Sequence, residues 1–304
     1  MCIRDRLYAL RGDAARGVGA SEQAKASYEK ALQLDSNEPR ALSGFVALLI
    51  DLGDFPRAAE VIAQMDRAKV RDLRADEQRL RYLVLTGAGQ SGVTTMRSAV
   101  ARHGKNVPLR LAGARVYLQA EDYTRAASYF QPAKRNGADV RLAETGLALA
   151  QVYGRRKLGA ENSLERALEA VDPEGQKLEA SPEVQVWELV VKARFALADQ
   201  KRGLAVRYAK QALAIRPDDA DVHLLQADIE EDRERSPEEA LRRASESRVP
   251  MPIAAGRLAV WLGPTEEGCA LAADYVKANR TGKQARKARD VTRQCQQQKE
   301  QAAE

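Results

Sequence analysis

Three glycines recur at a fixed interval along this chain: Gly19, Gly53 and Gly87 stand 34 residues apart. The residues around the first two glycines also correspond, in the pairs Ala24 with Ala58, Tyr28 with Ile62, and Ala31 with Met65. A period near 34 is typical of an array in which each repeat is a helix, a turn and a second helix. One such pair cannot bury its apolar face alone, so the period predicts an all-α solenoid of stacked pairs.

The first repeat shows how such a pair is built. Leu7 to Val18 and Glu22 to Leu34 are interpreted as two helices on either side of a turn at Gly19. Glycine adopts the positive φ that ends a helix without a steric cost, and we expect Gly19 to do so. Ser21 follows the turn, and we expect its hydroxyl to cap the second helix.

The run YALRGDAARGVGASEQAKASYEKALQLDSNEP, Tyr8 to Pro39, resembles the tetratricopeptide repeat (TPR). The family pattern is matched at Tyr8, Gly12, Ala15, Ala24, Tyr28 and Ala31, and it is broken at Ser36, where the family has proline. Further copies are matched by Leu52 to Met65, Glu121 to Ala133 and Lys201 to Val222. The resemblance implies a right-handed α-solenoid of stacked TPR units that binds other proteins and has no catalytic activity.

Counting in this register places seven units, which begin near Asp5, Pro39, Leu73, Val107, Arg141, Val186 and Ala220. The spacing between Ala167 and Ala212 is 45 instead of 34, and we assign the extra residues to a loop insertion near 171–183, which contains proline and glycine. The sequence therefore predicts a TPR array over 7–252, a helix pair or degenerate eighth unit over 253–279, and a basic, polar helix or tail over 280–304.

The first six residues, MCIRDR, resemble a translated adapter sequence found at the start of metagenome-assembled proteins. We expect residues 1–6 to be partly artefact, the source to be bacterial, and upstream sequence to be missing. The longest wholly apolar run, Phe45 to Ile50, is far too short to span a membrane. We expect a cytoplasmic protein, or a periplasmic one where an upstream signal or membrane anchor is missing.

The segment TGAGQSGVTT, Thr86 to Thr95, contains the spacing G-x-G-x-x-G and nearly fits a phosphate-binding P-loop. A P-loop needs a lysine that reaches the phosphates, and Val93 stands at that position. Gly87 instead falls in the repeat register with Gly19 and Gly53. We therefore interpret the segment as a turn between helices.

The cysteines and histidines indicate neither a metal site nor an active site. Cys2, Cys269 and Cys295 are odd in number and widely separated, and we expect them to be buried or surface thiols with no structural or functional role. His103 and His223 lie in different repeats, without a cysteine or aspartate at ligand spacing. No nucleophile, base and orienting group come together, so we expect no enzyme, no metal and no cofactor.

The family resemblance implies that the first helix of each unit lines a concave groove. Groove positions carried over residue by residue include the peptide-binding candidates Arg40, Arg74, Arg81, Arg115 and Arg194. A row of guanidinium groups can bind carboxylates through paired hydrogen bonds, although first-turn arginines are also often plain solvated charge. The Lys/Asn clamp with which some TPR proteins bind chaperone tails is not matched here, because its positions hold Ala9, Asp13, Gly44, Glu77 and Arg81.

The C-terminal segment carries the basic excess of the chain. Between Lys277 and Arg293, seven cations face Asp290 alone, which gives +6 and equals the net charge of the whole chain. The candidates within the last predicted helix are Lys283, Arg286, Lys287, Arg289 and Arg293. Such a helix attracts phosphate backbones or anionic lipid, yet it has neither aromatic residues that stack on bases nor an apolar face that enters a bilayer.

Together these features predict a non-catalytic scaffold that binds a peptide or an amphipathic helix of a partner protein in the TPR groove. The alternatives are nucleic-acid or anionic-surface binding through the basic segment, or a regulatory part of a larger multidomain protein. Nucleic acid is not the favoured partner, because no aromatic residue accompanies the cations.

Overall fold

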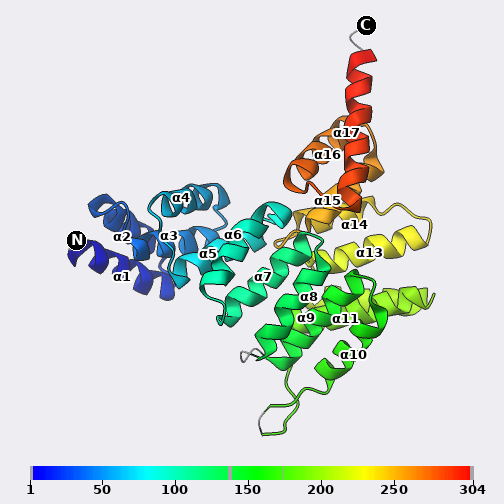
Figure 1. The fold of residues 1–304 in the computed structure, drawn as a ribbon, viewed down its shortest axis with the longest axis horizontal. Coiled ribbons are helices and arrows are strands. Elements are labelled where there is room, and N and C mark those ends of the chain that lie inside the picture. Colours follow the sequence, from blue (N-terminus) through cyan, green and yellow to red (C-terminus); the bar gives the residue numbers. More distant parts are fainter. Residues whose placement is uncertain (1–2, 136–138, 173, 302–304) are drawn as a thin grey trace. The chain divides into compact units, whose positions relative to one another are not determined.

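The computed structural model describes residues 3–135, 139–172 and 174–301, and within them the chain forms seventeen α-helices and no named strand (Figure 1). The all-α prediction is confirmed. Successive helices pack as pairs, and the pairs are α1 with α2, α3 with α4, α7 with α8, α9 with α10, α11 with α12, α13 with α14 and α15 with α16. We call the first helix of a pair its A helix and the second its B helix, and α5 and α6 take these names from their place in the chain order. The fold is therefore an α-solenoid of stacked pairs.

The A helices are α1 (Ile3–Gly17), α3 (Pro39–Asp51), α5 (Leu73–Leu85), α7 (Val107–Gln119), α9 (Val140–Tyr153), α11 (Pro182–Ala198), α13 (Ala220–Asp232) and α15 (Pro252–Leu262). The B helices are α2 (Ser21–Leu34), α4 (Phe55–Arg67), α6 (Gly89–Arg102), α8 (Tyr123–Arg135), α10 (Lys157–Leu168), α12 (Arg202–Ile215), α14 (Glu238–Glu246) and α16 (Glu266–Ala278). A last helix, α17 (Lys283–Gln301), follows them.

The chain divides into two compact units. The N-terminal unit comprises residues 1–86 and 95–104, and the C-terminal unit comprises residues 87–94 and 105–304. The N-terminal unit has its own apolar core, built on Tyr28, Phe45 and Met65. In the C-terminal unit the last helices pack around Leu258 and Tyr275.

The turns after the first seven A helices, α1 to α13, each contain a residue with positive φ at the same position. Gly19, Gly53 and Gly87 have φ values of 76°, 76° and 61°, as expected for glycines that end a helix. The later turns reach the same conformation without glycine, at Glu121, Arg155, Gln200 and Glu234, with φ between 58° and 59°. These residues continue the spacing of 34, with one step of 45 between Arg155 and Gln200. The repeat thus persists in the backbone where the glycine signal is lost.

The prediction that Ser21 caps the second helix is wrong. Helix α2 already includes Ser21, and its N-cap position is Ala20, which offers no side-chain hydrogen bond. The corresponding residue 34 positions later, Asp54, does cap α4 by accepting a hydrogen bond from the backbone N–H of Arg57 at 3.2 Å. The turn places the cap immediately after its glycine, one residue earlier than we expected.

Aromatic rings of the B helices pack on glycines of the A helices. Tyr28 is fully buried, and a Cβ atom at Gly12 or Gly44 would lie 2.5 Å from its ring. In the same way, a Cβ atom at Gly146 would lie 2.3 Å from the ring of Phe130, and a Cβ atom at Gly256 would lie 2.8 Å from the ring of Tyr275. The missing Cβ therefore creates the space into which each ring packs.

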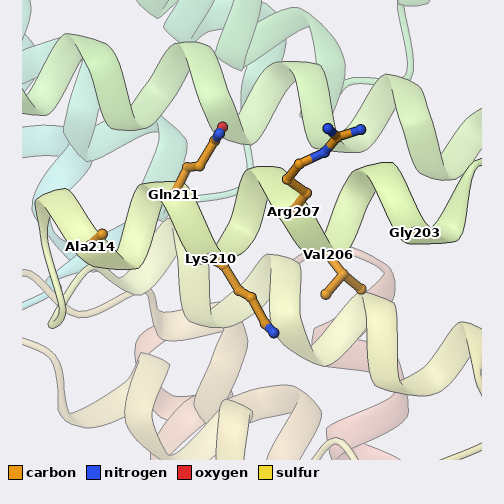
Figure 2. Close-up of a pocket in the computed structure, with 6 residues that line it drawn as sticks. All are labelled: Gly203, Val206, Arg207, Lys210, Gln211 and Ala214. Carbon is orange, nitrogen blue, oxygen red and sulfur yellow. The ribbon is translucent and has the colours of Figure 1, made fainter.

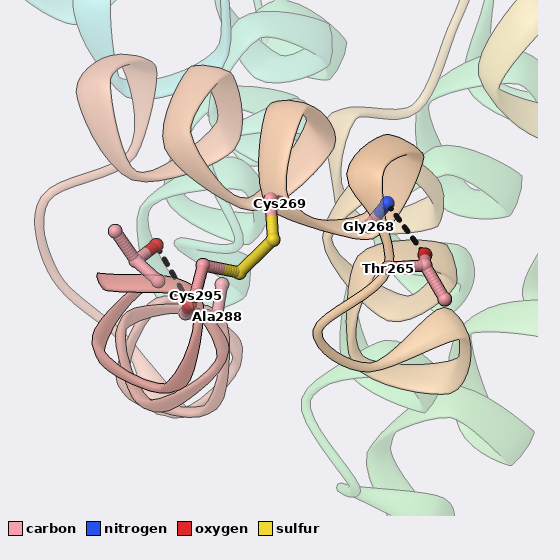
Figure 3. The surroundings of a disulfide bond; sticks show 6 residues. Thr265, Gly268, Cys269, Ala288 and Cys295 are labelled. Carbon is pink, nitrogen blue, oxygen red and sulfur yellow. Dashed lines mark hydrogen bonds between the residues drawn. A yellow bond between two sulfur atoms is a disulfide. The ribbon is translucent and has the colours of Figure 1, made fainter. Parts of the chain in front are cut away.

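Helix α17 closes the array through a covalent bond, which overturns the expectation of three unused thiols. Cys269 of α16 and Cys295 of α17 form a disulfide, with Cα atoms 6.0 Å apart (Figure 3). The two cysteines are 26 residues apart in sequence, so spacing gave no sign of the pairing. Ala285, Ala288 and Val291 of α17 are buried beside this bond.

Reduction of the disulfide is expected to lower the free energy of unfolding of the C-terminal unit by about 3 kcal/mol, because the open chain regains loop entropy. Both tryptophans, Trp187 and Trp261, lie in this unit, so their fluorescence during urea denaturation reports on it. The double variant Cys269→Ala/Cys295→Ala should match the reduced protein, and Cys2→Ala should match the oxidised one. Alkylation of all three thiols in the native, unreduced protein would contradict the pairing.

No helix in residues 3–135, 139–172 or 174–301 combines the length and the apolar character needed to cross a bilayer.

Candidate functional site

The A helices of the N-terminal unit bring arginines from three repeats together around two carboxylates. Asp13 of α1 accepts hydrogen bonds from Nε of Arg40 (α3) at 2.7 Å and from Nη1 of Arg74 (α5) at 2.8 Å, and a second, shorter bond from Arg74. The hydroxyl of Tyr28 donates to the same carboxylate at 2.7 Å. One aspartate therefore joins α1, α2, α3 and α5.

A second carboxylate repeats this arrangement farther along the same helices. Asp51 of α3 accepts hydrogen bonds from Nη1 of Arg16 (α1) at 2.8 Å and from Nη2 of Arg81 (α5) at 2.6 Å. We call Asp13, Asp51 and the four arginines bound to them, Arg16, Arg40, Arg74 and Arg81, the N-terminal arginine face. With four cations and two anions, this face keeps a net charge of +2.

The arginines of this face remain accessible. The side chains of Arg16, Arg40, Arg74 and Arg81 are 33%, 48%, 32% and 38% exposed. A guanidinium carries five N–H donors, whereas Arg40 donates to Asp13 through Nε alone and Arg81 donates to Asp51 through one terminal nitrogen. The aspartates thus hold the arginines in place without using up their hydrogen-bonding capacity.

The electrostatics keep both aspartates ionised. Burial raises the pKa of Asp13, but hydrogen bonds from Arg74, Tyr28 and Arg40 outweigh burial and lower the pKa from 3.8 to about 2. Burial also raises the pKa of Asp51, and hydrogen bonds from Arg81 and Arg16 bring it below its ordinary value.

Acid should therefore destabilise the N-terminal unit through Asp13. A depressed pKa contributes stability above the unfolded value, and that stability is lost as pH falls from about 4 to about 2. We expect the loss to reach up to about 2 kcal/mol. The difference in unfolding free energy between wild type and Asp13→Asn, measured in urea at a series of pH values, should shrink over this range. A difference that stays constant from pH 6 to pH 2 would contradict the account.

In the C-terminal unit the corresponding arginines are engaged inside the protein. Arg115 of α7 is 9% exposed and donates through Nη1 to Asp221 of α13 at 2.7 Å. The hydroxyl of Tyr153 (α9) donates to the other oxygen of Asp221 at 2.7 Å, and the Arg115 guanidinium lies 5.7 Å from the ring centre of Trp187 (α11). Burial lowers the pKa of Arg115, but Asp221 and Asp219 more than offset it, so this pKa lies above its usual value.

Arg194 of α11 is held in a similar way. It donates to Asp228 at 2.6 Å, its guanidinium lies 4.5 Å from the ring centre of Tyr153, and its Nε is buried without a hydrogen-bond partner. Arg257 of α15 donates to the other oxygen of Asp228 at 2.7 Å. The A helices α7, α9, α11, α13 and α15 are thus linked to one another by their own side chains.

The P-loop-like segment has a structural role in this unit. Gly87 and Gly89 both have positive φ, and a Cβ atom at Gly89 would lie 2.9 Å from the side-chain oxygen of Asn279. The side-chain oxygen of Gln90 accepts hydrogen bonds from the backbone N–H groups of Arg280 and Thr281 at 2.7 and 3.2 Å. The segment is therefore a short turn, residues 86–88, followed by the first turns of α6, and these bind the connection between α16 and α17. The interpretation as a turn holds only for its first three residues.

Two hollows lie on the C-terminal unit. One, of about 290 Å³, lies where α9, α10 and α11 meet, and it is lined by Val152, Arg155, Lys157, Arg194, Phe195, Leu197 and Ala198. The other is an open depression on α12, lined by Gly203, Val206, Arg207, Lys210, Gln211 and Ala214. Figure 2 shows the side chains of Arg207 and Gln211 on one side of this helix and those of Val206 and Lys210 on the other. In the part of the chain that the structure describes, no three His, Cys, Asp or Glu side chains are grouped as metal ligands would be.

The basic candidates lie on α17. Lys283, Arg286, Lys287 and Arg293 are exposed, and Arg289 is half-buried and donates to the backbone carbonyl of Arg280 at 2.8 Å. The structure thus separates the candidates into exposed arginines on the N-terminal unit, engaged arginines within the C-terminal unit, and cations on α17.

Sequence reasoning missed the carboxylates that organise these arginines. Asp13 was considered only as a groove position, and Asp51, Asp221 and Asp228 were not considered. Arg115 and Asp221 are 106 residues apart, so local spacing carried no signal. A comparison of positions on successive A helices could have identified Asp13, because Arg40 and Arg74 recur at 34.

Comparisons with known proteins agree with this architecture. Residues 15–77 match the family model described as the tetratricopeptide repeat. A search of curated protein sequences finds no significant match.

Among solved structures, that of PilF from Pseudomonas aeruginosa is 17% identical, with a TM-score of 0.53 over 74% of this chain and 97% of PilF. PilW, described as a widely conserved type IV pilus biogenesis factor, is 15% identical, with a TM-score of 0.53 over 73% of this chain and 97% of PilW. MamA is 18% identical, with a TM-score of 0.51 over 57% of this chain and all of MamA. These likenesses concern the fold alone. The family match over residues 15–77, this shared fold and the repeated turn together identify the chain as one that contains tetratricopeptide repeats.

Proposed function

We propose that this protein is a non-catalytic scaffold that binds an acidic peptide segment of a partner protein on the N-terminal arginine face. One observation carries the proposal: four half-exposed arginines from three successive A helices lie around only two carboxylates. The face therefore offers oriented N–H donors and a net positive charge to an incoming carboxylate.

The energetics favour such a ligand. The aspartates fix the arginine side chains before binding, so less side-chain entropy is lost when a peptide binds. Exposed ion pairs contribute little to stability, so exchanging part of Arg81–Asp51, in which both side chains are more than a third exposed, for a bond to a ligand costs little. We assign Arg115 and Arg194 to a different task, the internal linkage of the A helices in the C-terminal unit.

The test is crosslinking and capture of partners from the native host with wild type and with Arg40→Gln/Arg74→Gln/Arg81→Gln. Neutral glutamine avoids placing a new anion beside Asp13 and Asp51. The matched control is Arg57→Gln/Arg67→Gln/Arg71→Gln, which removes one half-buried and two exposed cations from α4 and the turn after it. A partner retained by wild type and the control but weakened at least about tenfold in the first variant would support the proposal.

Equal retention by all three proteins would reject the arginine face as the binding site. Equal loss in both variants would show that net charge, and not the arrangement around Asp13 and Asp51, governs capture. Once the partner is identified, its binding segment can be purified and titrated with each protein by fluorescence anisotropy. The ratio of the dissociation constants of the variant and the wild type then gives the loss of affinity.

A further inference from the structure

Helix α17 presents a row of cations that the rest of the protein does not neutralise. Its buried residues, Ala285, Ala288, Val291 and Cys295, define one face. At 100° per residue, the opposite face carries Lys283, Arg286, Asp290, Arg293 and Gln297, and all five are exposed. The packing of the helix therefore turns its charges toward solvent.

These cations differ from the arginines elsewhere in the chain. In the body of the protein most arginines contact a carboxylate, as Arg57 does with Glu29 and Arg242 with Glu267. On α17, within the described residues, the one such pair is Arg293 with Asp290, at 3.7 Å. The helix contains six lysines and arginines against two acidic residues. Its charge is thus available to an external anion.

The helix is also held in place before any ligand arrives. The disulfide between Cys269 and Cys295 joins it to α16, and the side chain of Gln284 donates to the backbone carbonyl of Gly256 in α15 at 2.7 Å. Figure 1 shows α17 beside α15 and α16 with its last turns extending past them, and residues 296–301 are all exposed. A fixed helix loses little entropy on binding.

The chemistry of the exposed surface restricts the partner. Every exposed residue of α17 is polar, so the helix can neither insert into a bilayer nor stack on bases. Recognition must therefore come from charge alone, which requires a surface with densely spaced anions. Disulfides persist in oxidising compartments, where a phosphate-rich surface is a membrane leaflet and not a nucleic acid.

We propose that α17 adsorbs this protein to a membrane surface rich in anionic phospholipids, without insertion. Clusters of four to eight lysines and arginines bind such headgroups, and each contributes while it lies within about a Debye length of the surface. Lys283, Arg286, Lys287 and Arg293 make the contact.

The test is sedimentation of the full chain with vesicles of phosphatidylcholine containing about 30% phosphatidylglycerol, compared with phosphatidylcholine alone. Wild type should partition at least about tenfold more strongly to the anionic vesicles and should dissociate as salt rises from about 0.05 to 0.5 M. The variant Lys283→Gln/Arg286→Gln/Lys287→Gln/Arg293→Gln should lose this binding about tenfold or more.

The matched control removes four exposed or half-exposed cations from B helices, in Lys30→Gln/Arg67→Gln/Arg207→Gln/Lys210→Gln, and it should bind as wild type does. Equal loss in the control would overturn the proposal, because overall charge would then be the cause. No binding to anionic vesicles, together with α17-dependent binding to a DNA duplex of about 20 base pairs, would overturn it in favour of nucleic acid.

Discussion

Replacing Arg115 by methionine is expected to lower the free energy of unfolding of the C-terminal unit by about 3–5 kcal/mol. In this variant the carboxylate of Asp221 stays fully buried and loses its cation, while it still accepts the hydrogen bond from the hydroxyl of Tyr153. An unpaired buried charge costs much more than the ion pair contributes when intact. Removing both charges in Arg115→Met/Asp221→Asn should therefore recover more than half of the loss.

Urea denaturation followed by tryptophan fluorescence measures this loss, because Trp187 lies beside Arg115. The matched control is Arg202→Met on α12, whose partner Asp232 is 41% exposed, and it should leave the free energy of unfolding almost unchanged. If Arg115→Met lowered the free energy of unfolding no more than Arg202→Met, Arg115 would not link α7 to α13 in solution.

The second large effect is expected at Tyr28. Truncation to alanine should destabilise the N-terminal unit by about 3–5 kcal/mol, because it empties the space between Gly12 and Gly44 and removes the hydroxyl that donates to Asp13. Gly44→Ala should cost about 1–3 kcal/mol in wild type, since its Cβ atom would lie 2.5 Å from the ring.

A double-mutant cycle separates these effects. In the Tyr28→Ala background the ring is gone, so Gly44→Ala should cost less than about 1 kcal/mol. Gly17→Ala is the control, because no atom lies within 4 Å of the added Cβ atom. Hydrogen exchange of peptides from α1, α2 and α3 measures the local stability. Additive costs at Tyr28 and Gly44 would mean that the ring does not occupy this space.

The fold could be predicted from the sequence because each repeat is a local structure. The glycines at 34-residue intervals, the small residues around them and the apolar periodicity all lie within single pairs of helices. Repeats without the glycine were harder to recognise, since Glu121, Arg155, Gln200 and Glu234 adopt the same turn at some cost in strain. Their conformation is imposed by the packing of neighbouring helices, which one sequence does not show.

The candidate site could be predicted only in part. The register placed Arg40, Arg74 and Arg81 on one face of successive A helices, but it did not show that Asp13 and Asp51 lie among them. Nor did it show that Arg115 and Arg194 would be engaged within the protein. Those contacts depend on how far each pair rotates relative to the next, and a small change per repeat decides whether α7 can reach α13. The pairing of Cys269 with Cys295 depends on the same geometry.

The most direct test of the central claim is photo-crosslinking from the A helices of the N-terminal unit. A photoreactive phenylalanine analogue at Glu77 of α5 lies on the same helix as Arg74 and Arg81, while the same analogue at Glu60 lies on the B helix α4. The account predicts that the captured partner crosslinks from position 77 and that an excess of an acidic peptide suppresses this crosslink. Crosslinking from position 60 alone, or from position 77 without competition by the peptide, would contradict binding on the N-terminal arginine face.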